Sequence, residues 1–316
     1  MADIKFGTRL GANWHSGAPS PQGLLDIARK GEEWGYDFVV SGDHISGSRS
    51  GTSPIMHCLP IITAAAAVTS KMHVGTSILQ LAMYNPAVIA RMMLTLDYLS
   101  EGRAFMGIGA GGAYPTEWEA AQSDVHTRGK RTDEALVVIN KLWSEENVDF
   151  QGEYYSLTNI TMAPKPMVPG GPPVLVGGLS DAALRRAARF GAGWTSTQMT
   201  SEAWADNMTK IKGYAAEIGR DLGDFQGMHS ISIHMDPDRE KALREAKEWL
   251  GDGGKVPFDE LAENYIAAGD ADDCARAIRK FLDAGAGWMI LSPIAPLDQL
   301  MPQLEMYAQD LFPKFK

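Results

Sequence analysis

Cysteine is scarce in this sequence of 316 residues, which contains only Cys58 and Cys274. Two thiols are too few for a disulfide framework or a thiolate metal site, so we expect a protein of a reducing cytoplasm without a metal. Long apolar runs are also missing, and the longest weakly polar stretch, residues 61–69, is too short to span a bilayer. The N-terminal residues show no basic segment followed by an apolar run and so predict no signal peptide.

Positive charge is in deficit, because 29 Lys and Arg stand against 39 Asp and Glu, for a net charge of −10. No stretch is rich in Lys and Arg, which argues against nucleic-acid binding. Low-complexity tracts are absent, and 45% of the residues are hydrophobic, which excludes the disordered and fibrous classes. We expect a globular protein with an ample core that binds neither nucleic acid nor membrane.

Short β-rich segments alternate with amphipathic helical patterns along the whole sequence. The predicted strands are Ile4–Leu10, Asp37–Ser41, His73–Ile78, Arg103–Ile108, Pro173–Gly177, Gly193–Ser196, Met228–His234 and Trp288–Ser292. The predicted helices are Pro21–Trp34, Ile55–Thr69, Pro86–Leu99, Arg128–Trp143, Ser180–Phe190, Glu202–Ile218, Arg239–Leu250, Ala271–Ala284 and Leu297–Leu311. This alternation predicts a parallel sheet, since each crossover returns along a helix. Eight such units favour a closed (β/α)8 TIM barrel, with an open α/β sheet as the alternative.

The chain is longer than the roughly 250 residues typical of such a barrel. We expect the surplus to form insertions within a single domain of residues 1–316. The main insertion is predicted at about 111–171, with a hairpin at Val148–Asn159 and a proline-rich run at 163–173. A smaller insertion is predicted at about 252–269.

Barrels of this kind carry their chemistry at the C-terminal ends of the strands, so the residues after each predicted strand are candidates. Gly177–Ser180 follow the fifth predicted strand and combine two glycines with a serine that suits the start of a helix. Close backbone approach and the positive end of a helix predict a phosphate-binding turn. The alternative is an ordinary strand–helix turn with a good cap.

Two further turns carry candidate residues. Asp43 and His44 follow the second predicted strand, where a barrel enzyme can place an acid or base that titrates near neutrality. The alternative for this pair is a loop histidine with a capping aspartate. The run Gly107–Gly112 is similar to a dinucleotide fingerprint, but no helix follows at once and no acidic residue lies at the required distance. We expect its glycines, Gly109 and Gly111 among them, to keep the mouth of the barrel flat against a planar ring.

Several longer motifs cover nearly the whole chain. They are Leu96–Arg103, Glu117–Ala120, Arg128–Glu134, Phe150–Tyr155, Pro173–Gly178 and Ala187–Trp194. In order and spacing these stretches resemble the bacterial luciferase-like oxidoreductases, a family of TIM barrels that use FMN or the deazaflavin coenzyme F-420. The resemblance implies an oxidoreductase with one of these cofactors across the mouth of its barrel.

The resemblance also implies where the cofactor binds and what acts on the substrate. The phosphate tail would lie against the Gly177–Ser180 turn, and a bulge with a non-prolyl cis peptide between Ser77 and Ile78 would support the back of the ring. His44 would be the catalytic residue, which donates or accepts a proton or stabilises charge. The residues expected to bind the cofactor are Asp43, Thr76, Ser77, Ile78, Gly109, Gly111, Gly177, Gly178, Leu179, Ser180, Ser196 and Thr197.

A substrate pocket is expected beside the cofactor, although its aromatic candidates could equally be ordinary packing. The candidates are Asn13, Trp14, His15, Tyr114, Trp118 and His234. The sugar-phosphate dehydrogenases of the family carry an acidic residue in place of Gly112 and a tryptophan in place of Ser48. These two departures weigh against oxidation of glucose 6-phosphate.

The favoured function is hydride transfer between coenzyme F-420 and a small organic substrate, because the Asp43–His44 pair is typical of deazaflavin-dependent relatives. One alternative is an FMNH2-dependent monooxygenase that inserts oxygen into a small apolar substrate. A separate flavin reductase would supply its FMNH2. Another is a non-catalytic flavin-binding barrel. Relatives form homodimers, and the apolar residues in 61–68 and 89–96 lead us to expect a homodimer here.

Overall fold

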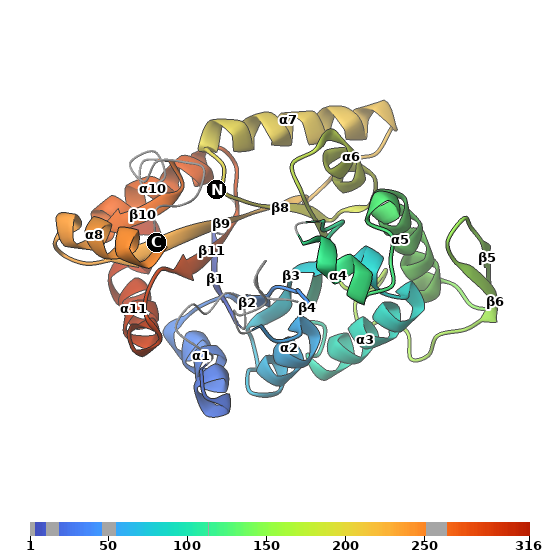
Figure 1. The fold of residues 1–316 in the computed structure, drawn as a ribbon, viewed down its shortest axis with the longest axis horizontal. Coiled ribbons are helices and arrows are strands. Elements are labelled where there is room, and N and C mark those ends of the chain that lie inside the picture. The colour runs from blue at the N-terminus through green and yellow to red at the C-terminus, as the bar shows by residue number, and fades with distance from the viewer. Residues whose placement is uncertain (1–3, 11–18, 46–54, 113, 251–263) are drawn as a thin grey trace.

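The computed structural model describes residues 4–10, 19–45, 55–112, 114–250 and 264–316. Within them, eight parallel strands close into a barrel (Figure 1). They are β1 (Lys5–Arg9), β2 (Phe38–Ser41), β3 (His73–Gln80), β4 (Ala104–Gly109), β7 (Val174–Gly177), β8 (Gly193–Thr197), β9 (Gln226–Met235) and β11 (Trp288–Pro293). The strands pair in the order β11-β1-β2-β3-β4-β7-β8-β9, and β9 pairs with β11 to complete the ring. The predicted (β/α)8 TIM barrel is confirmed.

Helices surround the strands and cover the outside of the barrel (Figure 1). They are α1 (Pro21–Trp34), α2 (Cys58–Ala67), α3 (Pro86–Leu99), α4 (Pro115–Ala120), α5 (Arg128–Ser144), α6 (Asp181–Phe190), α7 (Ser201–Glu217), α8 (Arg239–Leu250), α10 (Ala271–Asp283) and α11 (Leu300–Met306). Most of their bounds agree closely with the prediction, but α4 was not predicted, and α2 begins at Cys58 where Ile55 was expected. The C-terminal end also differs from the prediction. There the predicted helix Leu297–Leu311 divides into a 3-10 turn (Leu297–Gln299), α11 and a π-helical turn (Tyr307–Leu311).

The inside of the barrel is filled by an interior cluster of buried apolar side chains. Its members are Phe38, Val40, Phe105, Leu175, Met228 and Ile290. Two glycines leave room for the rings, because a Cβ on Gly7 would lie 2.3 Å from the Phe38 ring and a Cβ on Gly75 would lie 2.4 Å from the Phe105 ring. The barrel is therefore a packed core, and ligands are expected at its end and not along its axis.

Between β4 and β7 the chain forms α4, α5 and an antiparallel hairpin of β5 (Val148–Gln151) and β6 (Ser156–Ile160). The prediction included α5 and the hairpin but not α4. The segment predicted as a smaller insertion, 252–269, ends instead in a ninth strand, β10 (Ile266–Gly269). β10 pairs with the C-terminal half of β9, on the edge that β8 leaves open when it ends at Thr197. The four residues of β10 include one β-branched residue, so their sequence only weakly predicts a strand. They form a strand because the open edge of β9 offers backbone hydrogen-bond partners.

The residues expected at a dimer interface are mostly packed inside the chain itself, since Ile62, Ile89 and Met93 are fully buried. On α3 the side chains of Val88 and Leu99 remain exposed. The homodimer therefore stays a prediction. Among the described helices, none combines the length and the apolar character that crossing a bilayer requires.

Removal of the Phe105 ring tests whether the barrel interior is packed as described. The ring is 2% exposed and meets the rings of Phe38 and Trp288 edge-on. We expect Phe105→Ala to lower the free energy of unfolding by about 3–5 kcal/mol, measured by denaturant titration with circular dichroism. Leu99→Ala, at a position that is 52% exposed, is the control and should change stability by about 0.5 kcal/mol or less. A Phe105→Ala protein as stable as the control would contradict this packing.

Candidate active site

A bulge in β3 shapes the C-terminal end of the barrel. The peptide between Ser77 and Ile78 is cis, and the pairing of β3 with β4 shifts register between Thr76 and Leu79. Both features confirm what the family resemblance implies. The Thr76 side chain is fully buried and its Oγ1 donates to the carbonyl oxygen of Gly107 at 2.7 Å. Thr76 therefore holds the bulge against β4 and does not reach the mouth.

Glycines on β4 and β7 make room for this bulge. A Cβ on Gly107 would lie 2.1 Å from the carbonyl oxygen of Thr76, and a Cβ on Gly109 would lie 2.1 Å from Ile78 Cδ1. A Cβ on Gly177 would lie 3.1 Å from Ile78 Cγ2. The sequence predicts that the glycines at the end of β4 keep the mouth flat, whereas in the structure they accommodate the backbone and side chain of the bulge.

The turn after β7 is open to solvent and leads into α6. Gly178 has a φ of +121°, which residues with a side chain rarely adopt, and its carbonyl oxygen accepts from Trp194 Nε1 at 3.0 Å. Ser180 caps α6, since its Oγ accepts from the Ala183 N–H at 3.3 Å. Leu179 is 51% exposed. A glycine turn that opens onto a helix N-terminus suits an anionic group.

Ser196 and Thr197 lie on opposite faces of β8, because side chains alternate along a strand. Ser196 is buried, and its Oγ lies 2.9 Å from Nδ1 of His229, whose ring stacks on Phe281 of α10 outside the barrel. Burial lowers the pKa of His229 to about 3, so the imidazole is neutral at physiological pH. Contrary to the prediction, Ser196 does not face the mouth, and only Thr197 remains there, exposed at the end of its strand.

A buried carboxylate holds His44 at the end of β2. Nδ1 of His44 lies 3.1 Å from both Oε1 and Oε2 of Glu117, which is on α4. Glu117 is 1% exposed and also accepts from the Ile45 N–H at 2.7 Å and from Gln80 Nε2 at 3.3 Å. Gln80 Nε2 also lies 3.2 Å from Nδ1 of His44. Because only a protonated Nδ1 can donate to the two carboxylate oxygens, we assign the His44 proton to Nδ1, which leaves Nε2 as the nitrogen available to a ligand. The His44 side chain is 29% exposed.

The sequence did not indicate that His44, Glu117 and Gln80 would be in contact. Glu117 lies 73 residues after His44, and its motif indicated only the family. Gln80, at the end of β3, carried no motif at all, yet its Nε2 also donates to the carbonyl oxygen of Asp43 at 3.1 Å. Its Oε1 lies 2.1 Å from where a Cβ on Gly111 would stand, so Gly111 makes room for this amide.

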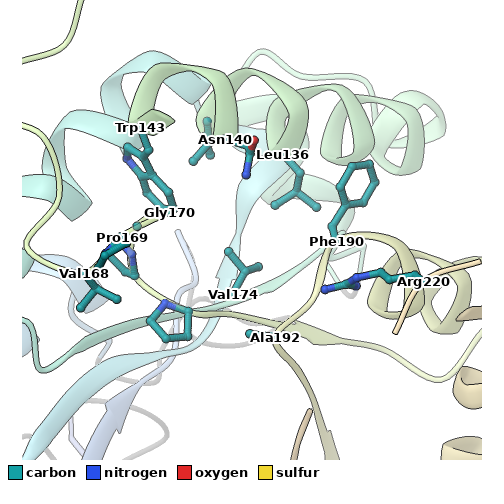
Figure 2. A pocket seen from close by; sticks show the side chains of 14 residues that line it. Leu136, Asn140, Trp143, Val168, Pro169, Gly170, Val174, Phe190, Ala192 and Arg220 are labelled. Atoms are coloured by element: carbon teal, nitrogen blue, oxygen red, sulfur yellow. The ribbon is translucent and has the colours of Figure 1, made fainter. Parts of the chain in front are cut away.

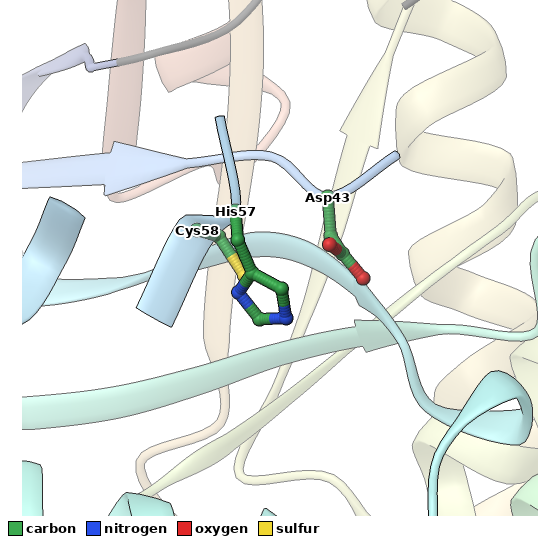
Figure 3. A group of neighbouring side chains, drawn as sticks. All are labelled: Asp43, His57 and Cys58. Atoms are coloured by element: carbon green, nitrogen blue, oxygen red, sulfur yellow. The ribbon is translucent and has the colours of Figure 1, made fainter. Parts of the chain in front are cut away.

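Asp43 lies deeper than His44, beside His57 and Cys58 at the start of α2 (Figure 3). Asp43 is 3% exposed, its Oδ2 accepts from the Tyr84 hydroxyl at 2.8 Å, and its Oδ1 is without a partner among the described residues. Burial raises the pKa of the Asp43 carboxyl, and the Tyr84 hydrogen bond acts in the opposite direction. Because this oxygen has almost no accessible surface, the role of Asp43 as a cofactor ligand stays a prediction.

Asp43, His57 and Cys58 could also be read as a metal site, because their ligand atoms lie within 4.8 Å of one another. Two observations argue against this interpretation. Nδ1 of His57 already accepts from the Leu59 N–H at 3.2 Å. Burial raises the pKa of the Cys58 thiol, which disfavours the thiolate that a metal requires.

The structure separates the residues predicted to line a substrate pocket. Asn13, Trp14 and His15 lie outside the described residues. Tyr114 faces His44, with 5.1 Å between the ring centroids. Trp118 is 2% exposed and packs against Ala82 and Met83, so it is part of the packing beneath α4.

His234, at the end of β9, is tied to α8. Its Nε2 lies 2.8 Å from Oε2 of Glu245, and its buried Nδ1 is without a partner in the described part of the chain. His234 is 5% exposed, and its place in a substrate pocket stays a prediction.

A cavity of about 310 Å³ lies at the opposite end of the barrel (Figure 2). Leu136 and Trp143 of α5 and Phe190 of α6 give it an apolar wall, and Arg220 stands at its edge. The cavity is also lined by Val174, the first residue of β7, and so lies at the N-terminal end of that strand. Barrel chemistry takes place at the C-terminal ends, so this cavity is separate from the candidate site.

Known proteins are similar to this chain over nearly its whole length. An F-420-dependent glucose-6-phosphate dehydrogenase of Segniliparus rotundus is 28% identical over 99% of this chain and 98% of its own length. The structure of an F-420-dependent secondary alcohol dehydrogenase with an F-420–acetone adduct has a TM-score of 0.84 at 22% identity and covers 98% of both chains. The oxygenating constituent of 3,6-diketocamphane monooxygenase from Pseudomonas putida, with FMN, has a TM-score of 0.78 at 20% identity and covers 99% of both chains. A profile of the family described as luciferase-like monooxygenase matches residues 3–308, and the chain therefore belongs to that family.

Proposed function

We propose that this oxidoreductase binds coenzyme F-420 at the C-terminal mouth of its barrel and transfers a hydride between it and a small organic substrate. The observation that carries the proposal is the His44–Glu117 pair, an imidazole fixed by a buried carboxylate at the end of β2. Relatives and solved neighbours named as F-420-dependent support the choice of cofactor. A barrel that only bound a ligand would not need an imidazole oriented in this way, which counts against the non-catalytic alternative.

The residues at the mouth fit a ring with an anionic tail. The turn Gly178–Ser180 and the start of α6 would hold the tail, with Thr197 nearby. The negative charge of Asp181 would repel an anion at this turn, but Asp181 Oδ1 accepts from Lys210 Nζ at 3.3 Å, and the lysine offsets that charge. Ile78 would support the back of the ring. When bound, the coenzyme supplies a ring carbon that gives or takes the hydride.

His44 would handle the proton that accompanies the hydride. When an alcohol is oxidised, its carbon loses a hydride and its hydroxyl loses a proton, and Nε2 of His44 would accept that proton. Glu117 would fix the tautomer through Nδ1 and stabilise the positive charge that forms on the ring. Tyr114 lies against the same imidazole and would limit its movement.

The second candidate is an FMN-dependent monooxygenase with a separate reductase as partner. The family description and the FMN-bound neighbour support it, and the same turn before α6 would accept the FMN phosphate. The mouth as described serves either ring, so the choice between the two functions depends on which cofactor binds.

Gly112 weighs against glucose 6-phosphate as the substrate. The resemblance places an acidic residue at this position in the sugar-phosphate dehydrogenases. Here Gly112 has a φ of +114°, and a Cβ on it would lie 3.0 Å from Nε of Arg128, so the site is built around a glycine. We therefore propose that the substrate is a different small organic molecule.

The cofactor is tested by adding F-420 and FMN separately to the purified protein. We expect F-420 to raise the melting temperature of the protein, because a ligand stabilises the folded state that binds it. The fluorescence of F-420 should change on binding, and FMN should bind more weakly. Binding of FMN alone would replace the proposal with the monooxygenase. Binding of neither would refute both.

The phosphate-binding turn is tested by Ser180→Asp, which keeps an oxygen acceptor at the helix cap but adds a negative charge. We expect the affinity for F-420, measured by fluorescence titration, to fall by about tenfold or more, since like charges would meet. The matched control is Ser20→Asp at the cap of α1, where Ser20 Oγ accepts from the Gly23 N–H at 3.0 Å, and it should leave the affinity unchanged. Equal affinities for the two variants would show that the tail binds elsewhere.

The His44–Glu117 pair is tested by two substitutions. We expect His44→Ala to retain F-420 affinity while single-turnover hydride transfer, with a substrate found by screening, slows by about 100-fold. Glu117→Gln should slow the same step by roughly 10-fold or more and shift the His44 proton away from Nδ1, which nitrogen NMR detects. Glu119→Gln, at an exposed position on the same helix, is the control. An unchanged tautomer and rate in Glu117→Gln would remove Glu117 from the mechanism.

A further inference from the structure

Arg9, the last residue of β1, reaches across the inside of the barrel. Its Nε donates to Ser292 Oγ on β11 at 3.1 Å, its Nη2 to Ser230 Oγ on β9 at 3.3 Å, and its Nη1 to the carbonyl oxygen of Ser77 on β3 at 2.8 Å. β3 and β9 are not neighbours of β1 in the sheet, so a single side chain can touch both only from inside. Because Ser77 belongs to the bulge that shapes the mouth, this hydrogen bond places the guanidinium beside the mouth.

This guanidinium is a positive charge with no carboxylate partner in the described part of the chain. Its three contacts are two hydroxyls and one carbonyl, and further N–H groups remain unused. Burial lowers the pKa of Arg9 to about 10, so it remains protonated at neutral pH. Arg186, in contrast, is a buried arginine that is paired with Asp133. An enclosed cation without a counter-ion is costly, and Arg9 retains accessible surface through which a ligand could supply one.

We propose that Arg9 is the counter-ion for negative charge on the ring of the bound cofactor. The inference rests on the proposed function, because it requires a ring at the mouth. The hydroxy-deazaflavin ring of F-420 becomes an anion when its hydroxyl releases a proton to solvent, and a reduced flavin ring does so when N1 releases one. In both cases the charge extends to the pyrimidine carbonyl oxygen and ring nitrogen, which can accept from the remaining N–H groups of Arg9.

The position of Arg9 supports a contact with the ring and not with the phosphate tail. Its Nη1 is bonded to the Ser77 carbonyl, which belongs to the bulge that would support the ring. The turn that would hold the tail follows β7, whereas the contacts of Arg9 lie on β3, β9 and β11. A fixed cation beside the ring would lower the pH at which the ring ionises.

The experiment is a pH titration of the bound ring, followed by its absorbance, which needs no substrate or turnover. F-420 is titrated on the wild type, on Arg9→Met and Arg9→Gln, which remove the charge, and on Arg9→Lys, which keeps it. We expect the neutral variants to raise the ionisation pH of the bound ring by about one unit or more and Arg9→Lys to retain most of the wild-type value. If FMN is the cofactor that binds, the same titration is made on reduced FMN without oxygen.

A matched control separates this effect from the general loss of an arginine. Arg220 is also partly buried, and within the described part of the chain its guanidinium donates to the carbonyl oxygens of Ala188 and Gly191 outside the barrel. Arg220→Met should leave the ionisation of the ring unchanged. The other titratable groups around the mouth are the same in every variant, so they cancel in the comparison. Among the described residues these groups include Asp43, His44, His57, Tyr84, Tyr114, Glu117, Arg128, Asp181, His234 and Glu245.

The possible outcomes are distinct. A bound ring that ionises at the same pH in the wild type and in the neutral Arg9 variants would overturn the proposal. A second result would also overturn it. In that result, acetate binds to the cofactor-loaded wild type but not to cofactor-loaded Arg9→Met, while the ring ionises at the same pH in both proteins. Arg9 would then bind a carboxylate of the substrate and not the ring. A wild type that binds neither F-420 nor FMN would refute the proposed function itself. If Arg9→Met does not fold, as judged by circular dichroism, Arg9→Gln and Arg9→Lys give the comparison.

Discussion

The mouth of this barrel depends on the bulge in β3 at Thr76–Ile78. The bulge moves backbone and an isoleucine side chain into space that adjacent strands would otherwise fill. Glycine at positions 107, 109 and 177 is the consequence, because any Cβ there would meet the bulge at close range. The same bulge presents the Ser77 carbonyl oxygen to Arg9 from across the barrel. One irregularity in a strand thus shapes the surface on which a ring could lie and provides a carbonyl oxygen that holds the Arg9 guanidinium.

Glu117 and Arg9 are charged groups at the mouth, and each has different hydrogen-bond partners. Glu117 is buried among N–H donors, one of which is the imidazole of His44, so its charge is used to orient a group that can exchange a proton. Arg9 is held by neutral oxygens and keeps its positive charge available. The interior cluster lies within the barrel and excludes water from its axis, which strengthens electrostatic interactions nearby. Such a site can both transfer a proton and stabilise negative charge on a ligand.

Periodicity and turn residues predicted much of the fold because they are local properties. The eight barrel strands, the hairpin before β7 and helices such as Pro21–Trp34 follow from side-chain patterns a few residues long. β10 was not predicted, since its short segment becomes a strand only beside the open edge of β9. Ser196 was assigned to the mouth from its place after a strand, but the alternation of side chains along β8 turns it outward to His229.

The sequence by itself determined the order of the eight barrel strands, the barrel class and the family, because hydrophobic spacing, caps and motifs are properties of consecutive residues. It also placed His44 and the Gly177–Ser180 turn at the ends of the strands that carry them. Only the tertiary structure decided what surrounds them: that Glu117, 73 residues further along, accepts from His44, and that Arg9 reaches the carbonyl of Ser77. These contacts arise when a closed ring of strands brings distant residues into one small volume, and no spacing along the chain records them.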